Sequence, residues 1–437
     1  MVKLHKLFAR LRTAGFLQNV SILAGGTALS QGLTVVTVPV ITRLYTPENL
    51  GGLALYLAVT MPIASLSSLY YSPAIVLPEK DQDAANIFLL AICIVSCISL
   101  IMLSIVVFLG YLVIPLLGEL RVAFWFWLIP LSVLLEGVYQ NSNYWFTRKK
   151  QFSRMAVARL TQSIATVCSQ LCAAIFFRAD LIGLIGGYVA GQFAASTILG
   201  IQIWRQDKSF IYQSADKKLM KQQAIRYKKY PIFGSWPSFC ANFMHSLPVL
   251  FLTKFYGYDV VGYYSLCRRI FNMTTTLVGR SIAQVLFQNL AEKKVRTGSI
   301  CIEVERAFRW LFLIAMLFLV GMIVASGLFG FFFGQDWIGA GNFLLILSPS
   351  FALMFMVSPM SLMLGIMNRQ ELSAGWHVVA LILTTIILGS SLIFRSATAS
   401  IYLLSLNNVI LYLIYAYLIL YASKCDFRRL MIPWRVA

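Results

Sequence analysis

Long apolar stretches alternate with short polar connections along the whole chain. A helix needs about 20 apolar residues to cross a bilayer, and twelve stretches meet that length. We predict spans at roughly 16–42, 50–76, 84–113, 122–145, 155–177, 181–204, 231–253, 260–290, 307–333, 341–367, 373–394 and 399–422. Most are longer than the bilayer requires, which favours tilted helices. The pattern predicts an all-α integral membrane protein with about 12 transmembrane helices.

Composition supports this class. Hydrophobic residues make up 59% of the chain and charged residues 12%, whereas globular proteins average about 45–50% and about 25%. The net charge of +20 would suggest nucleic-acid binding in a soluble protein. Here the Lys and Arg excess falls almost entirely on alternate connections, and the opposite set is close to neutral. By the positive-inside rule both termini are cytoplasmic, so the basic charge reflects topology.

The chain divides into two halves that resemble one another. We predict a six-helix lobe at 1–204, a basic cytoplasmic linker at 205–230 and a second six-helix lobe at 231–437. RLYTPENLG at 43–51 has the counterpart KFYGYDVVG at 254–262, and each follows the first span of its half. Parallel repeats of this kind predict a pseudo-two-fold axis along the membrane normal, with a central cavity between the lobes.

One predicted span, around Gly262–Leu286, carries a polar stripe. Arg269, Asn272, Thr276 and Arg280 are spaced i, i+3, i+7 and i+11, which places them on one face of a helix at about 100° per residue. An arginine at the centre of a lipid-facing helix costs at least about 2.5 kcal/mol. The stripe is therefore expected to face protein or water and to mark a functional site.

A second stripe with the same spacing lies in the span at 155–177. Its members are Arg159, Gln162, Thr166 and Gln170. Arg159 lies near the cytoplasmic end of its span, so snorkelling to the interface is an alternative to a functional role. A further alternative holds for both stripes, namely that their arginines bridge helices.

Glu136 is the clearest carboxylate inside a predicted span. Two interpretations fit it. It can take up a proton in a transport cycle, as acidic residues within membranes often do, or it can neutralise Arg159. We weight the ion pair somewhat higher. The sequence predicts no catalytic residues, no cofactor and no metal site, because no Walker loop, HExxH or GxSxG motif with partners is present.

Several stretches together resemble a known family. They include GGTALSQGLTVVTVPVITRLYTPENLGGLALY and LIGLIGGYVAGQ, and lie at 25–56, 72–87, 148–163, 181–192, 230–266, 279–287 and 332–341. In this order they resemble the polysaccharide exporters of the multidrug/oligosaccharidyl-lipid/polysaccharide (MOP) flippase superfamily, in particular Wzx-type O-antigen flippases. The resemblance extends to Arg159 and Arg269, while Arg280 rests on this sequence alone. The family commonly has proline where this chain has Thr274, which puts a kink there in doubt.

The resemblance implies that an undecaprenyl-diphosphate-linked oligosaccharide moves from the cytoplasmic to the periplasmic leaflet of a bacterial inner membrane. Arginine suits the diphosphate because its planar donors match phosphate oxygens. A proton or sodium gradient is the expected energy source, and a polysaccharide polymerase and chain-length regulator are expected partners. The alternatives are a cation-coupled drug exporter of the same superfamily and, with less support, a membrane enzyme that polymerises lipid-linked sugars.

Overall fold

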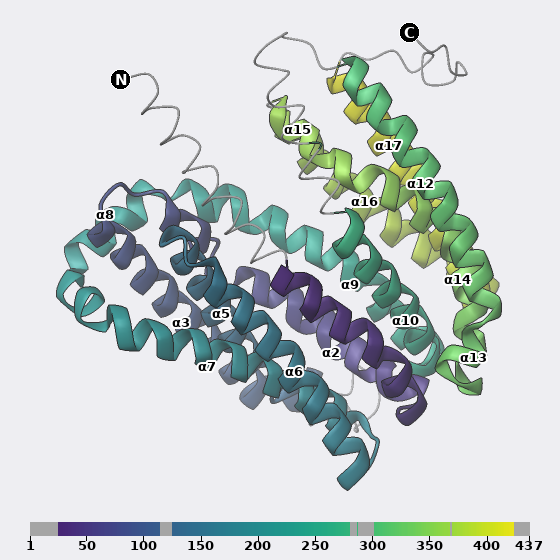
Figure 1. Cartoon of the computed structure of the whole chain (residues 1–437), viewed down its shortest axis with the longest axis horizontal. Helices are drawn as coiled ribbons and strands as arrows, with labels where there is room; N and C mark the ends of the chain where they lie inside the picture. The colour runs from purple at the N-terminus through teal and green to yellow at the C-terminus, as the bar shows by residue number, and fades with distance from the viewer. Residues whose placement is uncertain (1–24, 114–124, 280–285, 287–300, 368, 424–437) are drawn as a thin grey trace. The chain divides into compact units, whose positions relative to one another are not determined.

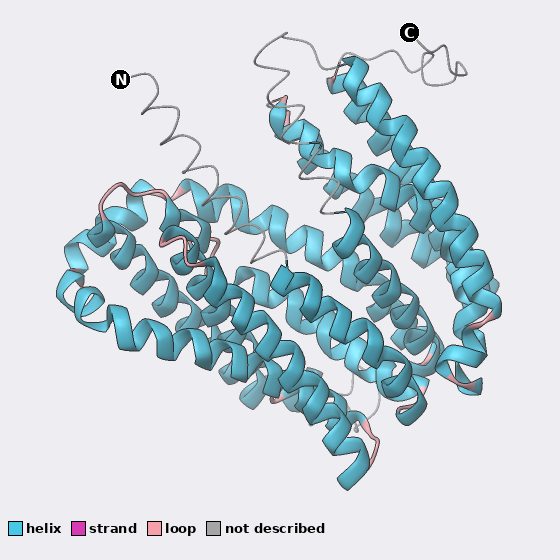
Figure 2. Cartoon of the chain, in the orientation of Figure 1, coloured by secondary structure: helices cyan, strands magenta, loops and turns pink. Residues whose placement is uncertain are grey.

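The computed structural model describes residues 25–113, 125–279, 286, 301–367 and 369–423. These ranges are helical with short loops between the helices and contain no strand (Figure 2). The main elements (Figure 1) are a helix at 25–44, α2 (Pro47–Leu66), α3 (Asp81–Val113), α5 (Ile129–Arg148), α6 (Phe152–Phe176), α7 (Leu181–Ser214), α8 (Lys217–Arg226), α9 (Trp236–Tyr256), α10 (Tyr258–Thr274), α12 (Cys301–Gly327), α13 (Phe329–Phe333), α14 (Ile338–Val357), α15 (Leu362–Ile366), α16 (Gln370–Ser391) and α17 (Ala397–Ala422).

Each predicted span overlaps a described helix, so the all-α prediction is confirmed. Among the described residues, 7 helices are long and apolar enough to cross a membrane. The remaining helices at predicted spans are shorter or more polar: the one at 25–44, α5, α6, α9 and α10. They include the helices of both polar stripes and of Glu136, as expected if polar faces turn away from lipid. Both termini lie outside the described residues, and their cytoplasmic placement stays a prediction.

Two compact units divide the chain. One comprises the residues up to Tyr45 together with Gly52–Ser246, and the other comprises Thr46–Gly51 with the residues from Leu247 onward. Two helices therefore belong to both units: α2 starts in the second and continues in the first, and α9 starts in the first and ends in the second. The boundary falls inside α9, beyond the connection at 205–230. The lobes predicted at 1–204 and 231–437 stay a prediction.

The connection at 205–230, predicted as a basic cytoplasmic linker, is mostly helical. Helix α7 continues to Ser214, and α8 follows after one short turn. Asp207 on this extension is buried; it accepts a hydrogen bond from the indole of Trp145 at 2.9 Å and forms an ion pair with Lys149. Asn86 of α3 donates to the carbonyl of Ser214 at 2.8 Å. The hydropathy pattern shows that this segment is polar and charged. It does not reveal the buried polar contacts that hold the segment against α3 and α5.

Helices α6 and α7 pack closely through a glycine series. Gly183, Gly187 and Gly191 recur every four residues on one face of α7. A Cβ atom on Gly187 would lie 2.5 Å from Cγ of Gln170, and one on Gly191 would lie 1.9 Å from Oγ1 of Thr166. Small residues at this spacing let membrane helices approach within backbone contact. The α6 side of this interface therefore includes two members of the second polar stripe, Thr166 and Gln170.

Candidate functional site

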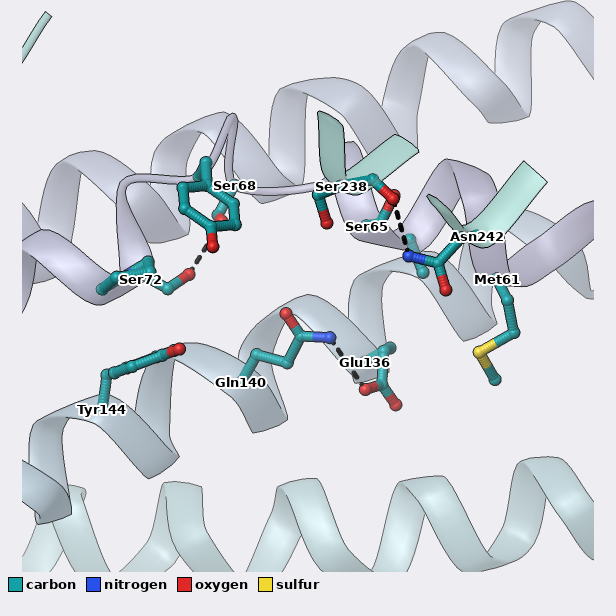
Figure 3. A pocket seen from close by; sticks show the side chains of 12 residues that line it. Met61, Ser65, Ser68, Ser72, Glu136, Gln140, Tyr144, Ser238 and Asn242 are labelled. Atoms are coloured by element: carbon teal, nitrogen blue, oxygen red, sulfur yellow. Dashed lines mark hydrogen bonds between the residues drawn. The ribbon is translucent and has the colours of Figure 1, made fainter. Parts of the chain in front are cut away.

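A polar cavity lies within the first unit, between α2, α5 and α9. Its volume is about 140 Å³. It is lined by Met61, Ala64, Ser65, Ser68, Tyr70, Ser72, Pro73, Glu136, Gln140, Tyr144, Ser238 and Asn242. In Figure 3, Glu136, Gln140 and Tyr144 point from α5 into the cavity, and Ser238 and Asn242 face them from the opposite wall. Most of these side chains carry hydrogen-bonding groups.

The wall opposite α5 includes an irregular segment that the sequence-based spans missed. Helix α2 ends at Leu66, ten residues before the predicted end at 76, and Leu69 and Tyr70 adopt left-handed φ angles of 45° and 61°. Non-glycine residues seldom adopt such angles without local support. One support is Gly234, where a Cβ atom would lie 2.2 Å from Cδ1 of Tyr70. Irregular backbone within a membrane protein is tolerated where it lines a cavity.

Glu136 is held by amide donors. Gln140 donates from Nε2 to Oε1 of Glu136 at 3.0 Å, and Gln192 of α7 donates to Oε2 at 3.3 Å. Gln192 also donates to the hydroxyl of Tyr188 at 3.0 Å. Arg159 instead donates to Oγ1 of Thr27 at 2.7 Å. The predicted ion pair between Glu136 and Arg159 is therefore wrong, because each side chain has a neutral partner of its own.

Several cavity groups have unused hydrogen-bonding capacity. The amide of Asn242 donates to the carbonyl of Ser238 at 2.9 Å, but its Oδ1 atom accepts no hydrogen bond within the described part of the chain, and neither does Oε1 of Gln140. The hydroxyls of Tyr144 and Ser238 likewise have no hydrogen-bond partner among the described residues. Polar groups at a partly enclosed surface gain free energy when a ligand or water satisfies them.

The predicted stripe on α6 separates into two parts. Gln170 is 2% exposed, its Nε2 atom donates to the carbonyl of Leu184 at 3.1 Å, and Thr166 packs against Gly191. These two side chains belong to the α6–α7 interface, which favours a packing role over cargo binding. Arg159 and Gln162 are half-buried, and the guanidinium of Arg159 is fixed by Thr27.

The stripe on α10 lies in the second unit. Arg269 is half-buried, and within the described ranges its side chain makes no hydrogen bond or ion pair. Its neighbour Arg268 instead donates to the hydroxyl of Tyr264 at 3.3 Å. Asn272 is exposed, Thr276 lies in a π-helical segment at Thr275–Gly279, and Arg280 lies outside the described residues. The π-helical turn follows Thr274 directly, so this helix is irregular there although it lacks the proline.

Sequence reasoning found Glu136 but missed the cavity around it. The signals available were Ser238 and Asn242, spaced i and i+4 on one helical face, and the serines of the segment after α2. No three His, Cys, Asp or Glu side chains gather as a metal site in the described ranges. No disulfide joins the described cysteines.

The chain matches one protein family and is similar in fold to several solved structures. The model of the family described as "Polysaccharide biosynthesis protein" matches residues 40–342. The lipid II flippase MurJ in an inward closed conformation is 11% identical, with 94% of this chain and 89% of that chain covered and a TM-score of 0.70. An inward-facing multidrug resistance MATE family transporter of the MOP superfamily is 13% identical, with 90% and 94% covered and a TM-score of 0.64.

A third solved structure, of the MATE multidrug transporter DinF-BH, is 14% identical, with 92% and 95% covered and a TM-score of 0.65. No curated protein matches the chain. Identities this low show the fold alone. The chain therefore has the all-helical, two-lobed fold of about 12 membrane helices that the sequence predicts, and it is a multi-pass membrane protein.

Proposed function

Because the chain belongs to the polysaccharide biosynthesis protein family, we propose that it is a flippase for an undecaprenyl-diphosphate-linked oligosaccharide. The cargo moves from the cytoplasmic to the periplasmic leaflet of a bacterial inner membrane by alternating access through a cationic central cavity. The flippase is of the Wzx type and serves the synthesis of O-antigen or a related polysaccharide. A polymerase and a chain-length regulator are its proposed partners.

The observation that supports this proposal most is the state of Arg269. Its side chain has no hydrogen bond or ion pair among the described residues, although it lies in a helix at a predicted membrane span. Keeping an arginine there costs free energy, which binding of an anionic group would offset. A guanidinium offers several donors in a plane and stays ionised, so it suits a diphosphate better than an ammonium does.

Other stripe residues are proposed to assist Arg269 to different degrees. Asn272 is exposed beside it on the same helix, and Thr276 lies one turn further on. Both can hydrogen-bond sugar hydroxyls or phosphate oxygens. Arg159 and Gln162 contribute a second polar surface. Arg280 is included in the first stripe only because of its spacing from Arg269 in the sequence. Thr166 and Gln170 are left out of the proposed site because both pack against α7.

A cation-coupled drug exporter is the second candidate, and one observation favours it. The carboxylate of Glu136 is the only charged group among the described residues that line the cavity, and a carboxylate suits an organic cation. In either case the energy source is proposed to be a proton or sodium gradient, with Glu136 as the proton acceptor. An enzyme that polymerises sugars has no comparable support from the described residues.

Transport sidedness tests the proposal. Purified protein in proteoliposomes should move a fluorescent lipid-diphosphate sugar from one leaflet to the other, as measured by quenching from outside. We expect Arg269→Ala to slow this movement at least about tenfold, equivalent to about 1.4 kcal/mol, and Arg269→Lys to restore part of the rate. The matched control is Arg178→Ala, an exposed arginine in a loop. Unchanged flipping in Arg269→Ala would remove its assigned role, and export of organic cations alone would favour the second candidate.

A further inference from the structure

We propose that the cavity of Glu136 is a subsite for one uncharged or amino-bearing sugar of the cargo's glycan, and that it discriminates against acidic sugars. This inference rests on the proposed function and assigns the specificity of part of the cargo. Glu136, Gln140, Ser238 and Asn242 provide the hydrogen-bonding groups, and Tyr144 provides an aromatic wall.

The size of the cavity fits a small polar ligand. A cavity needs about 10–15 Å³ to hold one water, so about 140 Å³ corresponds to roughly ten water-sized positions. One monosaccharide ring has a comparable number of heavy atoms, whereas a drug-sized ligand usually fills a pocket of about 300–1,000 Å³. The cavity therefore suits one sugar unit better than a whole oligosaccharide or a large aromatic cation.

The arrangement of polar groups also fits a sugar. A sugar hydroxyl both donates and accepts, so a ring with several hydroxyls needs acceptors and donors distributed around it. The cavity offers free acceptors at Oδ1 of Asn242 and Oε1 of Gln140, and hydroxyls at Tyr144 and Ser238. These groups come from α5 on one side and α9 on the other (Figure 3). A ligand that spans the cavity can bond to both walls at once.

Charge decides which sugars are accepted. The described residues of the lining include Glu136 and no Lys, Arg or His. Gln140 and Gln192 direct amide N–H groups at the two carboxylate oxygens. The carboxylate of a uronic acid would enter a site whose described lining offers no cation to pair with it, whereas an ammonium on the sugar would pair with the carboxylate of Glu136.

A site for a simple cation explains fewer of the residues that line the cavity than a sugar subsite does. Sodium or another hard cation requires several oxygen ligands that converge on one point. Here both carboxylate oxygens already accept hydrogen bonds, and the free polar groups lie on opposite walls of the cavity (Figure 3). The dispersed arrangement favours a ligand with several separate polar groups.

Binding of simple glycosides tests the subsite without requiring transport. The probes are the methyl glycosides of galactose, glucosamine and glucuronic acid, titrated against the purified full-length protein in detergent and followed by saturation-transfer NMR. We expect the galactoside and the glucosaminide to bind and the glucuronide to bind at least about tenfold more weakly, a difference of about 1.4 kcal/mol. No binding by any glycoside, or equal binding by all three, would overturn the proposal.

Variants locate the binding. Glu136→Gln should weaken the glucosaminide and strengthen the glucuronide, so that the preference disappears, while Asn242→Ala should weaken all three probes. The matched control is Glu305→Gln, a buried carboxylate of α12 in the second unit that the cavity does not contain. If Glu136→Gln fails to fold, Gln140→Ala provides the same test from the same helix, and thermal unfolding identifies which variants are folded. Unchanged affinities in folded variants would place the binding elsewhere.

Two competing ligands complete the experiment. Displacement of the galactoside by millimolar sodium, or by the organic cation tetraphenylphosphonium, would assign the cavity to a cation and overturn the sugar subsite. The outcome is separable from the proposed function. Transport of the lipid-diphosphate sugar without glycoside binding at Glu136 would remove the subsite and leave the flippase intact. Glycoside binding without lipid transport would leave the sugar subsite intact and remove the proposed flippase function.

Discussion

Gly51 of α2 and Gly262 of α10 each lie against the main chain of the other's helix. A Cβ atom on Gly51 would lie 2.0 Å from the carbonyl oxygen of Tyr258, and one on Gly262 would lie 2.0 Å from the carbonyl oxygen of Pro47. Pro47 and Tyr258 are also corresponding positions of the repeated segments at 43–51 and 254–262. The repeat inferred from sequence is thus present in the structure as a reciprocal contact, and all four residues belong to the second unit.

This contact predicts that Gly262→Ala is poorly tolerated. The added methyl group would meet backbone rather than a movable side chain, and overpacking of this kind costs about 1–3 kcal/mol. We expect a lower unfolding temperature of the purified protein and lower abundance in membranes, and the same from Gly51→Ala. The control is Gly321→Ala in α12, where nothing lies within 4 Å of the added atom. Equal stability of all three variants would contradict the contact.

A second glycine prediction concerns α6 and α7. Gly191→Ala would bring a methyl group to 1.9 Å from Oγ1 of Thr166 and 2.8 Å from the carbonyl oxygen of Gln162, so the helices would have to separate. We expect a loss of about 1–3 kcal/mol of stability, measured by denaturant or thermal unfolding in detergent. Gly186→Ala on the same helix meets nothing within 4 Å and should leave stability nearly unchanged. A Gly191→Ala variant as stable as Gly186→Ala would contradict this packing.

These glycines also show where sequence reasoning stops. Helical periodicity placed Gln170 and Arg269 on polar faces of their helices by the same spacing argument, but it cannot say what each face meets. Gln170 meets a glycine series of α7 and is buried by it. Arg269 meets no hydrogen-bonding partner among the described residues. The fold class and the spans followed from local apolar patterns, whereas the identity of a neighbour depends on the partner helix.

The cavity illustrates the same limit. Its walls are formed by α2, α5 and α9, which are far apart in sequence. They also include the segment after Leu66, which the hydropathy pattern assigned to a membrane span. Glu136 was predictable as a buried carboxylate because its charge stands out in an apolar stretch. Its amide partner Gln192 was not predictable, since a long-range hydrogen bond leaves no periodic signal in either segment.

Asp207 gives a prediction for the extended end of α7. Removing its carboxylate in Asp207→Ala would leave the ammonium of Lys149 and the indole N–H of Trp145 without their acceptor. Breaking one side of a buried ion pair costs about 3–5 kcal/mol, and we expect about 3 kcal/mol because the Lys149 side chain retains 28% exposure. Unfolding in detergent measures the loss. Asp259→Ala, at an exposed position, is the control, and an Asp207→Ala variant no less stable than it would contradict the role.

A substitution at Glu136 can test whether this residue couples transport to a proton gradient, separately from its role in binding the cargo. The Glu136→Gln side chain keeps its size and can still accept a hydrogen bond, but it cannot take up a proton. If flipping is driven by proton exchange at this residue, an imposed proton gradient should accelerate flipping of a cargo with neutral sugars by the wild-type protein and not by Glu136→Gln. The measurement is leaflet sidedness in proteoliposomes with and without the gradient, with Glu305→Gln as the matched carboxylate control. Acceleration that persists in Glu136→Gln would move the coupling to another group, and acceleration by a sodium gradient alone would replace the proton as driving ion.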